Sequence, residues 1–137
     1  GAAISIVVGS HSSDKAGGPV TLDGTVEWAG EKAFPMGGKM GRGRPVDLGK
    51  TAVIRVGGIV VWLISANLSA INLDPFERFD MDHRDFDIVV LRSKTHFRAV
   101  WETEAAEIII VDTPDWGPAL LDSLPYRRAR PGVFPIT

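Results

Sequence analysis

The most reactive group of neighbouring side chains in this sequence lies in four consecutive residues, Ser93-Lys94-Thr95-His96. They supply two hydroxyl groups, an ammonium group and an imidazole directly after the apolar run Ile88–Leu91. If a strand ends and a helix begins here, free backbone N–H groups and the helix dipole would favour an anion at this point. Lys94 would add a full positive charge, and Ser93 or Thr95 a hydroxyl. We therefore predict that Ser93, Lys94 and Thr95 bind an anionic substrate.

Two simpler interpretations stay open for the same turn. Ser93 or Thr95 can serve only as the N-cap of the helix, because a hydroxyl accepts a hydrogen bond from a free N–H group of the first turn. His96 is a candidate catalytic residue if it faces the substrate. Its position on the first turn suits a hydrogen-bonded core histidine equally well.

A strand–helix–strand pattern surrounds this turn. Phe97, Val100 and Trp101 have helical spacing, and the run Ile108–Val111 predicts a second strand. Such a βαβ crossover is nearly always right-handed, with parallel strands. Both apolar runs are continuous, which is typical of strands buried on two faces. The turn would then lie beyond the carboxyl end of a strand, where ligands bind in open α/β sheets.

A second candidate site is the basic, glycine-rich stretch Phe34–Leu48. Its four glycines and two prolines disfavour a helix or a central strand, and a flexible, solvated loop is the favoured interpretation. Its cations, Lys39, Arg42 and Arg44, also suit a flap that reaches an anionic ligand, so Arg42 and Arg44 join the predicted substrate-binding residues. The spacing matches neither a phosphate loop nor a dinucleotide fingerprint.

The remaining regular structure is predicted mostly as β. Apolar patterning and glycine turns predict strands with a bulge at Gly24 and a hairpin turn at Gly57-Gly58. These strands cover Ile4–Val8, Val20–Trp28, Thr51–Val56 and Ile59–Ser65. Asp74 is the expected N-cap of a short helix that begins at Pro75.

We therefore predict an α+β fold: a mixed β-sheet with several hairpins, one βαβ unit and few short helices. An α/β sandwich is the alternative. The 137 residues form a single domain, 1–137, which is long enough to bury a core. At its end we expect one helical turn from Leu120, Leu121 and Leu124, followed by an extended basic segment, Pro125–Pro131.

Composition excludes several classes of function. The net charge of −2 gives no electrostatic footprint for nucleic acid. The longest apolar run, Ile59–Ala66, is too short to cross a bilayer, so no membrane association is predicted. There are no cysteines, which excludes a disulfide scaffold and fits a reducing compartment. We expect a cytoplasmic protein.

No metal site is predicted in this sequence. The three histidines, His11, His83 and His96, are far apart, and no HExxH or CxxC motif is present. The segment Asp80–Asp85 holds three carboxylates and His83, but such acids in a turn are usually caps or solvated. The chain does not look like a complete enzyme by itself.

The stretch DFDIVVLRSKTHFRAVWETEAAEIIIVDTP, followed by LPYRRARPGVFPI, resembles the C-terminal domain of MlrC-like metallopeptidases, bacterial proteins named after microcystin degradation. Gly17-Gly18-Pro19-Val20, Asp47–Val53 and Arg55-Val56-Gly57-Gly58 match in the same order. Arg92 stands where the family more often has lysine, which rules out a role for a lysine there. His83 stands where proline is common.

The resemblance implies a two-domain, zinc-dependent amide hydrolase. Zinc and its ligands would belong to a larger N-terminal catalytic domain outside this chain, and the substrate would be peptide-like, as is linearised microcystin. This domain would complete or cover the substrate cleft and would be inactive alone. The rival hypothesis is a non-catalytic interaction or dimerisation module that stabilises its partner domain. Whether the protein forms a homo-oligomer stays open.

Overall fold

The computed structural model describes residues 1–9, 17–93, 95–111, 124–130 and 132–134. The chain divides into two compact units, one of Gly1–Ile6 with Leu22–Ile108 and the other of Val7–Thr21 with Ile109–Thr137. The helices and most of the sheet belong to the first unit. That residues 1–137 form a single domain stays a prediction.

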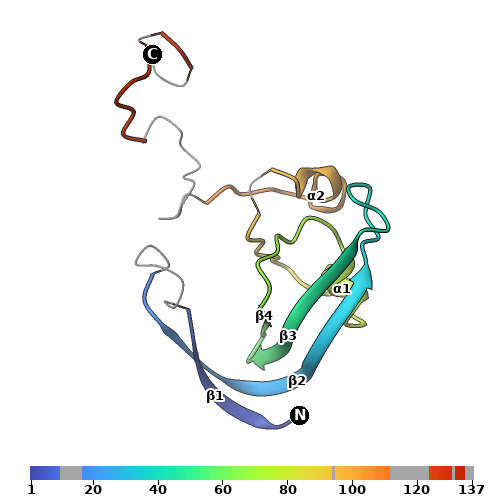
Figure 1. The fold of residues 1–137 in the computed structure, drawn as a ribbon. Helices are drawn as coiled ribbons and strands as arrows, with labels where there is room; N and C mark the ends of the chain where they lie inside the picture. Colours follow the sequence, from blue (N-terminus) through green and yellow to red (C-terminus); the bar gives the residue numbers. More distant parts are fainter. Residues whose placement is uncertain (10–16, 94, 112–123, 131, 135–137) are drawn as a thin grey trace. The chain divides into compact units, whose positions relative to one another are not determined.

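A four-stranded sheet forms the framework, in the order β1-β2-β3-β4 (Figure 1). Its strands are β1 (Ala3–Val8), β2 (Val20–Pro35), β3 (Pro45–Val56) and β4 (Ile59–Ile64). β2 with β3, and β3 with β4, pair antiparallel. The predicted hairpin through Gly57-Gly58 is confirmed, because Val56 pairs with Ile59 and Gly57 has a φ of 58°. Glycine adopts this left-handed conformation without steric cost.

β2 is longer than its alternation predicted, and its irregularity lies elsewhere. The register with β3 shifts between Val26 and Trp28 and again between Glu31 and Ala33, rather than at Gly24. Gly24 instead permits a close approach of the two strands, since a Cβ there would lie 2.3 Å from the carbonyl oxygen of Arg55. The loop expected over Phe34–Leu48 is also shorter, because Pro35 pairs with Pro45 and only the residues between them form the turn.

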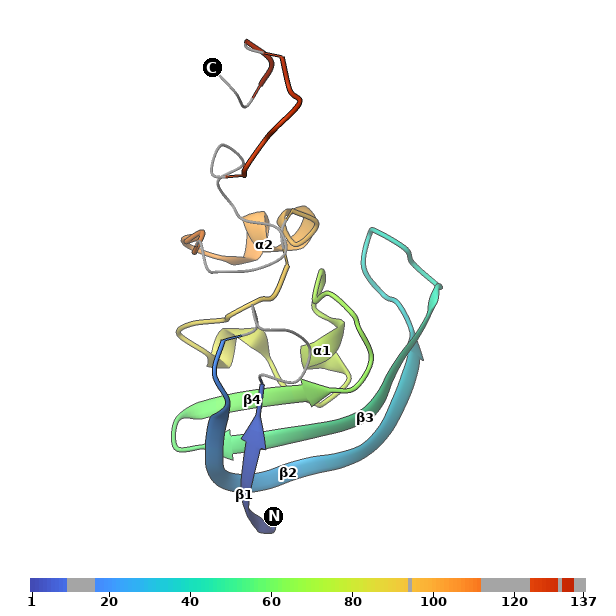
Figure 2. The same ribbon diagram turned by 60° about the vertical axis from the view of Figure 1, so that its left-hand side comes forward.

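Aromatic packing holds the first helix on one face of the sheet. Trp28 on β2 and Trp62 on β4 both pair with Val53 of β3, so the three residues form one row across the sheet. Val53 is fully buried. Phe76 of α1 (Asp74–Glu77) meets Trp62 edge-on at 4.8 Å, and Phe79 meets Trp28 at 5.0 Å. Figure 2 shows α1 lying against this sheet.

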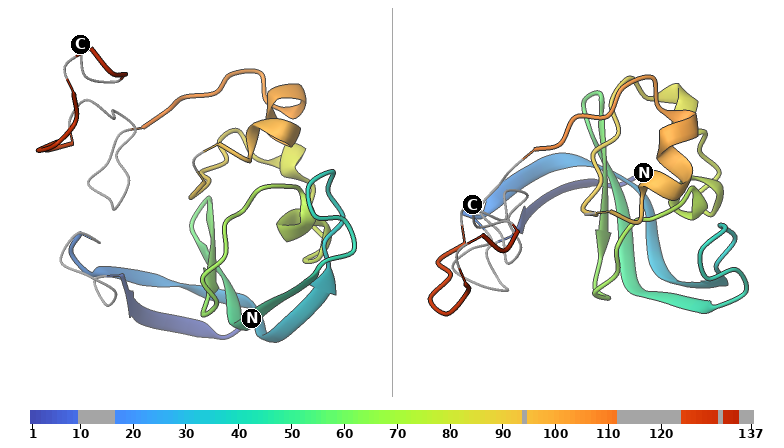
Figure 3. Two further views of the ribbon diagram at one scale, coloured as in Figure 1. Left: turned by 45° about the horizontal axis from the view of Figure 1, so that its top comes forward. Right: turned by 90° about the horizontal axis from the view of Figure 1, so that it is seen from above.

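The second helix closes a small core with the first. α2 (Arg98–Glu104) confirms the short helix that the spacing predicted, and Arg98 pairs with Glu102 on its surface at 2.9 Å. Phe76, Phe97 and Trp101 form the buried cluster that joins α1 to α2. The two helices lie near each other in both views of Figure 3. No helix in the described part of the chain is long and apolar enough to cross a membrane.

The predicted βαβ unit is wrong. Ile88–Leu91 and Ile108–Val111 flank α2, but neither run pairs as a strand within the described residues. The predicted mixed sheet is therefore antiparallel, and the parallel strands of an α/β sandwich are likewise missing from the residues described. β-branched composition favours extended backbone, but a strand also needs a neighbouring strand for its hydrogen bonds. The fold is mostly β with few short helices.

The C-terminal segment belongs to the second unit. Its described residues from Leu124 to Arg130 are all exposed, including the side chain of Tyr126. Pro125–Pro131 was predicted to be an extended basic segment; its residues as far as Arg130 are exposed, and none of them forms a strand. Leu120 and Leu121, which were expected to form a helical turn with Leu124, lie outside the described residues.

Candidate functional site

The turn before α2 does not cap the helix with a hydroxyl. The N-cap of α2 is Phe97 and makes no side-chain hydrogen bond, so N-capping by Ser93 or Thr95 is wrong. The carbonyl oxygen of Thr95 accepts a hydrogen bond from the N–H of Arg98 at 3.2 Å, which continues the first turn backwards. His96 is exposed, so it is not a core histidine. Lys94 lies outside the described residues.

The turn before α2 lacks two features on which anion binding was predicted. No strand forms at Ile88–Leu91 in the described part of the chain. The helix that follows, α2, has only seven residues, so its dipole is small. Substrate binding by Ser93, Lys94 and Thr95, and catalysis by His96, stay predictions from the sequence.

The basic residues lie on the tip that connects β2 to β3, which we define as residues 36–44. The N–H of Met36 donates to the carbonyl oxygen of Arg44 at 2.9 Å, and the N–H of Gly43 donates to that of Met36 at 2.8 Å. Lys39, Arg42 and Arg44 are exposed. In the described part of the chain, none of the three forms an ion pair with an acid. The tip therefore displays three cations on an ordered turn.

A buried carboxylate anchors this basic tip. Asp74 is 3% exposed and accepts hydrogen bonds from the N–H of Gly37 at 3.1 Å and 3.0 Å, one to each oxygen. The side-chain oxygen of Asn72 accepts from the N–H of Asp74 at 3.1 Å. Arg78 stands 3.8 Å from the same carboxylate and donates to the carbonyl oxygen of Pro35 at 3.3 Å. Asp74 thus fixes the tip rather than serving as the predicted N-cap, which is Leu73.

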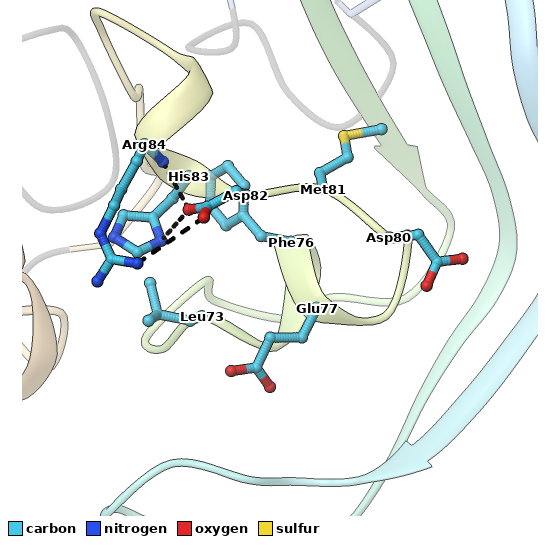
Figure 4. A pocket seen from close by; sticks show the side chains of 8 residues that line it. All are labelled: Leu73, Phe76, Glu77, Asp80, Met81, Asp82, His83 and Arg84. Carbon is cyan, nitrogen blue, oxygen red and sulfur yellow. Dashed lines mark hydrogen bonds and ion pairs between the residues drawn. The ribbon is translucent and has the colours of Figure 1, made fainter.

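An open pocket of about 520 Å³ lies below α1 and the following turn (Figure 4). Its lining is Leu73, Phe76, Glu77, Asp80, Met81, Asp82, His83 and Arg84. Figure 4 shows the carboxylates of Glu77, Asp80 and Asp82 pointing in different directions, with only Asp82 turned toward His83 and Arg84. The pocket therefore lacks a convergent set of acidic oxygens.

His83 is the centre of a polar cluster that forms part of the lining of this pocket. It begins the 3₁₀ helix η1 (His83–Asp85), and its side chain is 10% exposed. Its Nε2 lies 3.1 Å from Oε2 of Glu104 in α2, and its Nδ1 lies 3.4 Å from Oδ1 of Asp82. Arg84 contacts the same Glu104 oxygen at 3.1 Å. The histidine ring also meets Phe76 and Trp101 edge-on.

These residues do not fit a zinc site. A zinc ligand needs a free imidazole nitrogen or a free carboxylate oxygen aimed at one point. Both ring nitrogens of His83 face carboxylates, and the Asp82 side chain accepts the N–H of Arg84 at 2.9 Å. No group of three or more His, Cys, Asp or Glu residues in the described part of the chain could hold a metal. The cluster instead ties η1 to α2.

The structure does not gather the predicted site residues around this pocket. Neither the described residues of the Ser93–His96 turn nor Arg42 and Arg44 belong to its lining. Sequence reasoning also missed the two polar anchors, Asp74 with Gly37 and His83 with Glu104. Their partners are 37 and 21 residues apart in the chain, so no periodicity connects them.

The described part of the chain is thus mostly β, with exposed cations on its basic tip. Its two polar anchors, Asp74 with Gly37 and His83 with Glu104, stabilise the fold. Residues 1–128 match the family model described as the MlrC C-terminus. The chain belongs to this family, and the resemblance seen in its sequence is confirmed. No curated protein and no solved structure gives a significant match.

Proposed function

We propose that this chain is the accessory C-terminal domain of a zinc-dependent metallopeptidase of the MlrC type, and that it completes or covers the substrate cleft. The family match over residues 1–128 carries the proposal, because MlrC is associated with a peptidase of microcystin degradation. We assign the zinc and its ligands to an N-terminal catalytic domain of the same protein. The proposal places the whole protein in the cytoplasm.

The basic tip is the part of this domain that we assign to substrate binding. A peptide-like substrate carries carboxylates, and Arg42 and Arg44 can each donate two parallel hydrogen bonds to such a group. Both side chains are exposed, and the backbone that carries them is anchored at Gly37 by Asp74. An anchored loop loses less conformational entropy on binding than a free one. The turn Ser93–His96 is assigned to the same substrate.

A second function, a non-catalytic interaction module, is favoured by a different observation. The candidate residues do not line the pocket below α1, whereas Ile88 and Val90 are almost fully exposed apolar side chains. Exposed apolar groups that lie together are a common mark of protein interaction surfaces. In this alternative the domain only stabilises or dimerises its N-terminal partner.

Zinc content and hydrolysis, measured on the full-length protein and on the 137-residue chain in parallel, test the proposal. After dialysis we expect stoichiometric zinc and hydrolysis of linearised microcystin in the full-length protein only. Tightly held zinc in the short chain, lost on replacing His83 or His96, would contradict the assignment of the ligands. A full-length protein that hydrolyses no peptide, and that loses only thermal stability when this domain is removed, would favour the interaction module.

A further inference from the structure

The stem of the basic tip, residues 35–37, is held from outside the sheet by α1. On one side of Met36, the N–H of Gly37 donates to the buried carboxylate of Asp74. On the other side, the carbonyl oxygen of Pro35 accepts a hydrogen bond from Nη2 of Arg78 at 3.3 Å. Asp74 and Arg78 are four residues apart at the two ends of α1, so they lie on one face of the helix. Met36 is therefore flanked by two residues that α1 holds.

Met36 in turn supports the part of the tip that carries its two arginines. Its N–H donates to the carbonyl oxygen of Arg44 at 2.9 Å, and its carbonyl oxygen accepts from the N–H of Gly43 at 2.8 Å. The N–H of Arg44 donates to the carbonyl oxygen of Gly41 at 2.9 Å, which closes a turn around Arg42. A displacement of Met36 is therefore transmitted to the backbone of both arginines.

A single nitrogen of Arg78 makes the polar contacts of this side chain. Nη2 donates to Pro35 and also lies 3.8 Å from Oδ1 of Asp74. The guanidinium group lies 5.2 Å from the centre of the Phe34 ring, which is within cation–π range. Within the described residues, the buried Nε has no hydrogen-bond partner. A buried donor without an acceptor lowers stability, so Arg78 holds the stem at some cost to its own hydrogen bonding.

The side chain of Arg78 thus supports the backbone that carries the tip arginines. We infer that Arg78 is a positioning residue for substrate binding, which acts through Pro35 and Met36. The groups that it positions are Arg42 and Arg44, which meet the carboxylates of a peptide-like substrate. This inference rests on the proposed function, because it requires that the tip binds substrate. A backbone that is held in place before binding loses less conformational entropy when the complex forms. Loosening the stem should therefore weaken substrate binding and leave the chemical step unchanged.

Arg78→Met and Arg78→Lys, made in the full-length protein, separate positioning from general stability. Methionine keeps an unbranched side chain but donates no hydrogen bond, so the carbonyl oxygen of Pro35 loses its partner. Lysine carries one ammonium nitrogen with three donors, which can replace the single nitrogen that arginine uses here. Arg98→Met is the matched control, because Arg98 is also paired with an acid four residues away, Glu102. Melting temperatures establish that all three variants are folded.

Amide hydrogen exchange measures the order of the tip independently of substrate. In Arg78→Met, we expect the amides of Met36 and Gly43 to exchange at least about 10-fold faster, because their hydrogen bonds open with the stem. The amides of Val53 and Ile54, in the buried part of β3, should keep their rates, which shows that the change is local. The lysine variant and the control should exchange like the wild type. Unchanged exchange at Met36 and Gly43 in Arg78→Met would overturn the inference.

The values of KM and kcat for linearised microcystin test the connection to substrate. Arg78→Met should raise KM by about 2- to 10-fold and leave kcat unchanged, since ordering a loose side chain on binding weakens affinity by roughly this factor. Arg78→Lys should restore KM. In a protein that already carries Arg42→Ala and Arg44→Ala, Arg78→Met should not change KM any further. A purely structural role would give the same effect with and without the two arginines.

The arginine variants separate this inference from the proposed function. If Arg42→Ala and Arg44→Ala raise KM but Arg78→Met does not, the substrate site stands and the inference alone is overturned. An increase in KM from Arg78→Met that persists without the two arginines also overturns the inference and leaves the substrate site intact. If Arg42→Ala and Arg44→Ala keep the wild-type KM, substrate binding by the tip is rejected, and the inference fails with it.

Discussion

The carboxylate of Asp74 accepts hydrogen bonds at 3.1 Å and 3.0 Å from a single backbone N–H, that of Gly37. The contact connects the first residue of α1 to the turn between β2 and β3 across 37 positions of the chain. A Cβ at Gly37 would lie 2.8 Å from Oδ1 of Asp74, so a larger residue would force the carboxylate to shift. A buried acid and a residue without a side chain together hold the basic tip in place.

Asp74→Ala should therefore destabilise the domain. The change removes the acceptor and leaves the N–H of Gly37 without a partner, which typically costs about 1–3 kcal/mol. The free energy of unfolding in urea measures the loss, and faster amide exchange across the basic tip would locate it. Asp85→Asn is the control, because its side chain is exposed and should change stability by less than about 0.5 kcal/mol. Equal stability of the two variants would show that the Asp74 contact is dispensable.

Gly24→Ala should weaken the pairing of β2 with β3. A Cβ at this position would lie 2.3 Å from the carbonyl oxygen of Arg55, so the two strands must separate. Crowding of this kind typically costs about 1–3 kcal/mol. Gly58→Ala is the matched control in a turn where a Cβ meets nothing within 4 Å. Urea denaturation of both variants compares them, and a loss as large for Gly58→Ala as for Gly24→Ala would refute the steric explanation.

Local sequence signals predicted the elements that depend on local geometry. The turn at Gly57-Gly58 needs only a positive φ, and α2 needs only an apolar stripe at helical spacing, so both were predictable. Whether Ile88–Leu91 pairs as a strand was not predictable in the same way, and within the described residues it does not. Composition indicates extended backbone, whereas the neighbouring strand is decided by which segments meet in space.

The two polar anchors, at Asp74 and His83, were also only partly predictable, because their partners lie far away in the sequence. Asp74 beside Pro75 carries a helix-start signal, and the structure does begin a helix there. The carboxylate itself serves Gly37, a partner that no pattern within a few residues could indicate. In the same way, His83 could be considered as a metal ligand because its neighbours in the sequence are acids. Its partner Glu104 comes from the next helix.

The contact between His83 and Glu104 should contribute measurably to stability. The two side chains lie 3.1 Å apart, with exposed fractions of 10% and 27%, and the imidazole also packs on Phe76 and Trp101. We expect His83→Ala to cost about 1–3 kcal/mol, because it removes a hydrogen bond and leaves a gap between α1 and α2. Thermal and urea unfolding measure the effect.

A double-mutant cycle with Glu104→Gln isolates the pair from the packing. A coupling near zero between the two changes would show that His83 acts through its ring contacts alone. Glu102→Ala provides the comparison, since its pair with Arg98 is exposed on both sides and should be worth less than about 0.5 kcal/mol.

Substrate binding by the basic tip and by the turn before α2 gives the last prediction. In the full-length enzyme, Arg42→Ala and Arg44→Ala should each raise KM for linearised microcystin, because a charge-assisted contact to a substrate carboxylate is lost. One such contact is worth on the order of 1–3 kcal/mol, or roughly 5- to 150-fold in binding.

Lys94→Ala should also raise KM, and His96→Ala should lower kcat if the imidazole transfers a proton. Arg98→Ala is the control, because it removes an exposed cation that is already paired with Glu102. Melting temperatures establish that every variant is folded. If the Arg42 and Arg44 variants keep the KM of the control, the tip does not bind substrate. If Lys94→Ala and His96→Ala leave both constants unchanged, the turn is only a connection to α2.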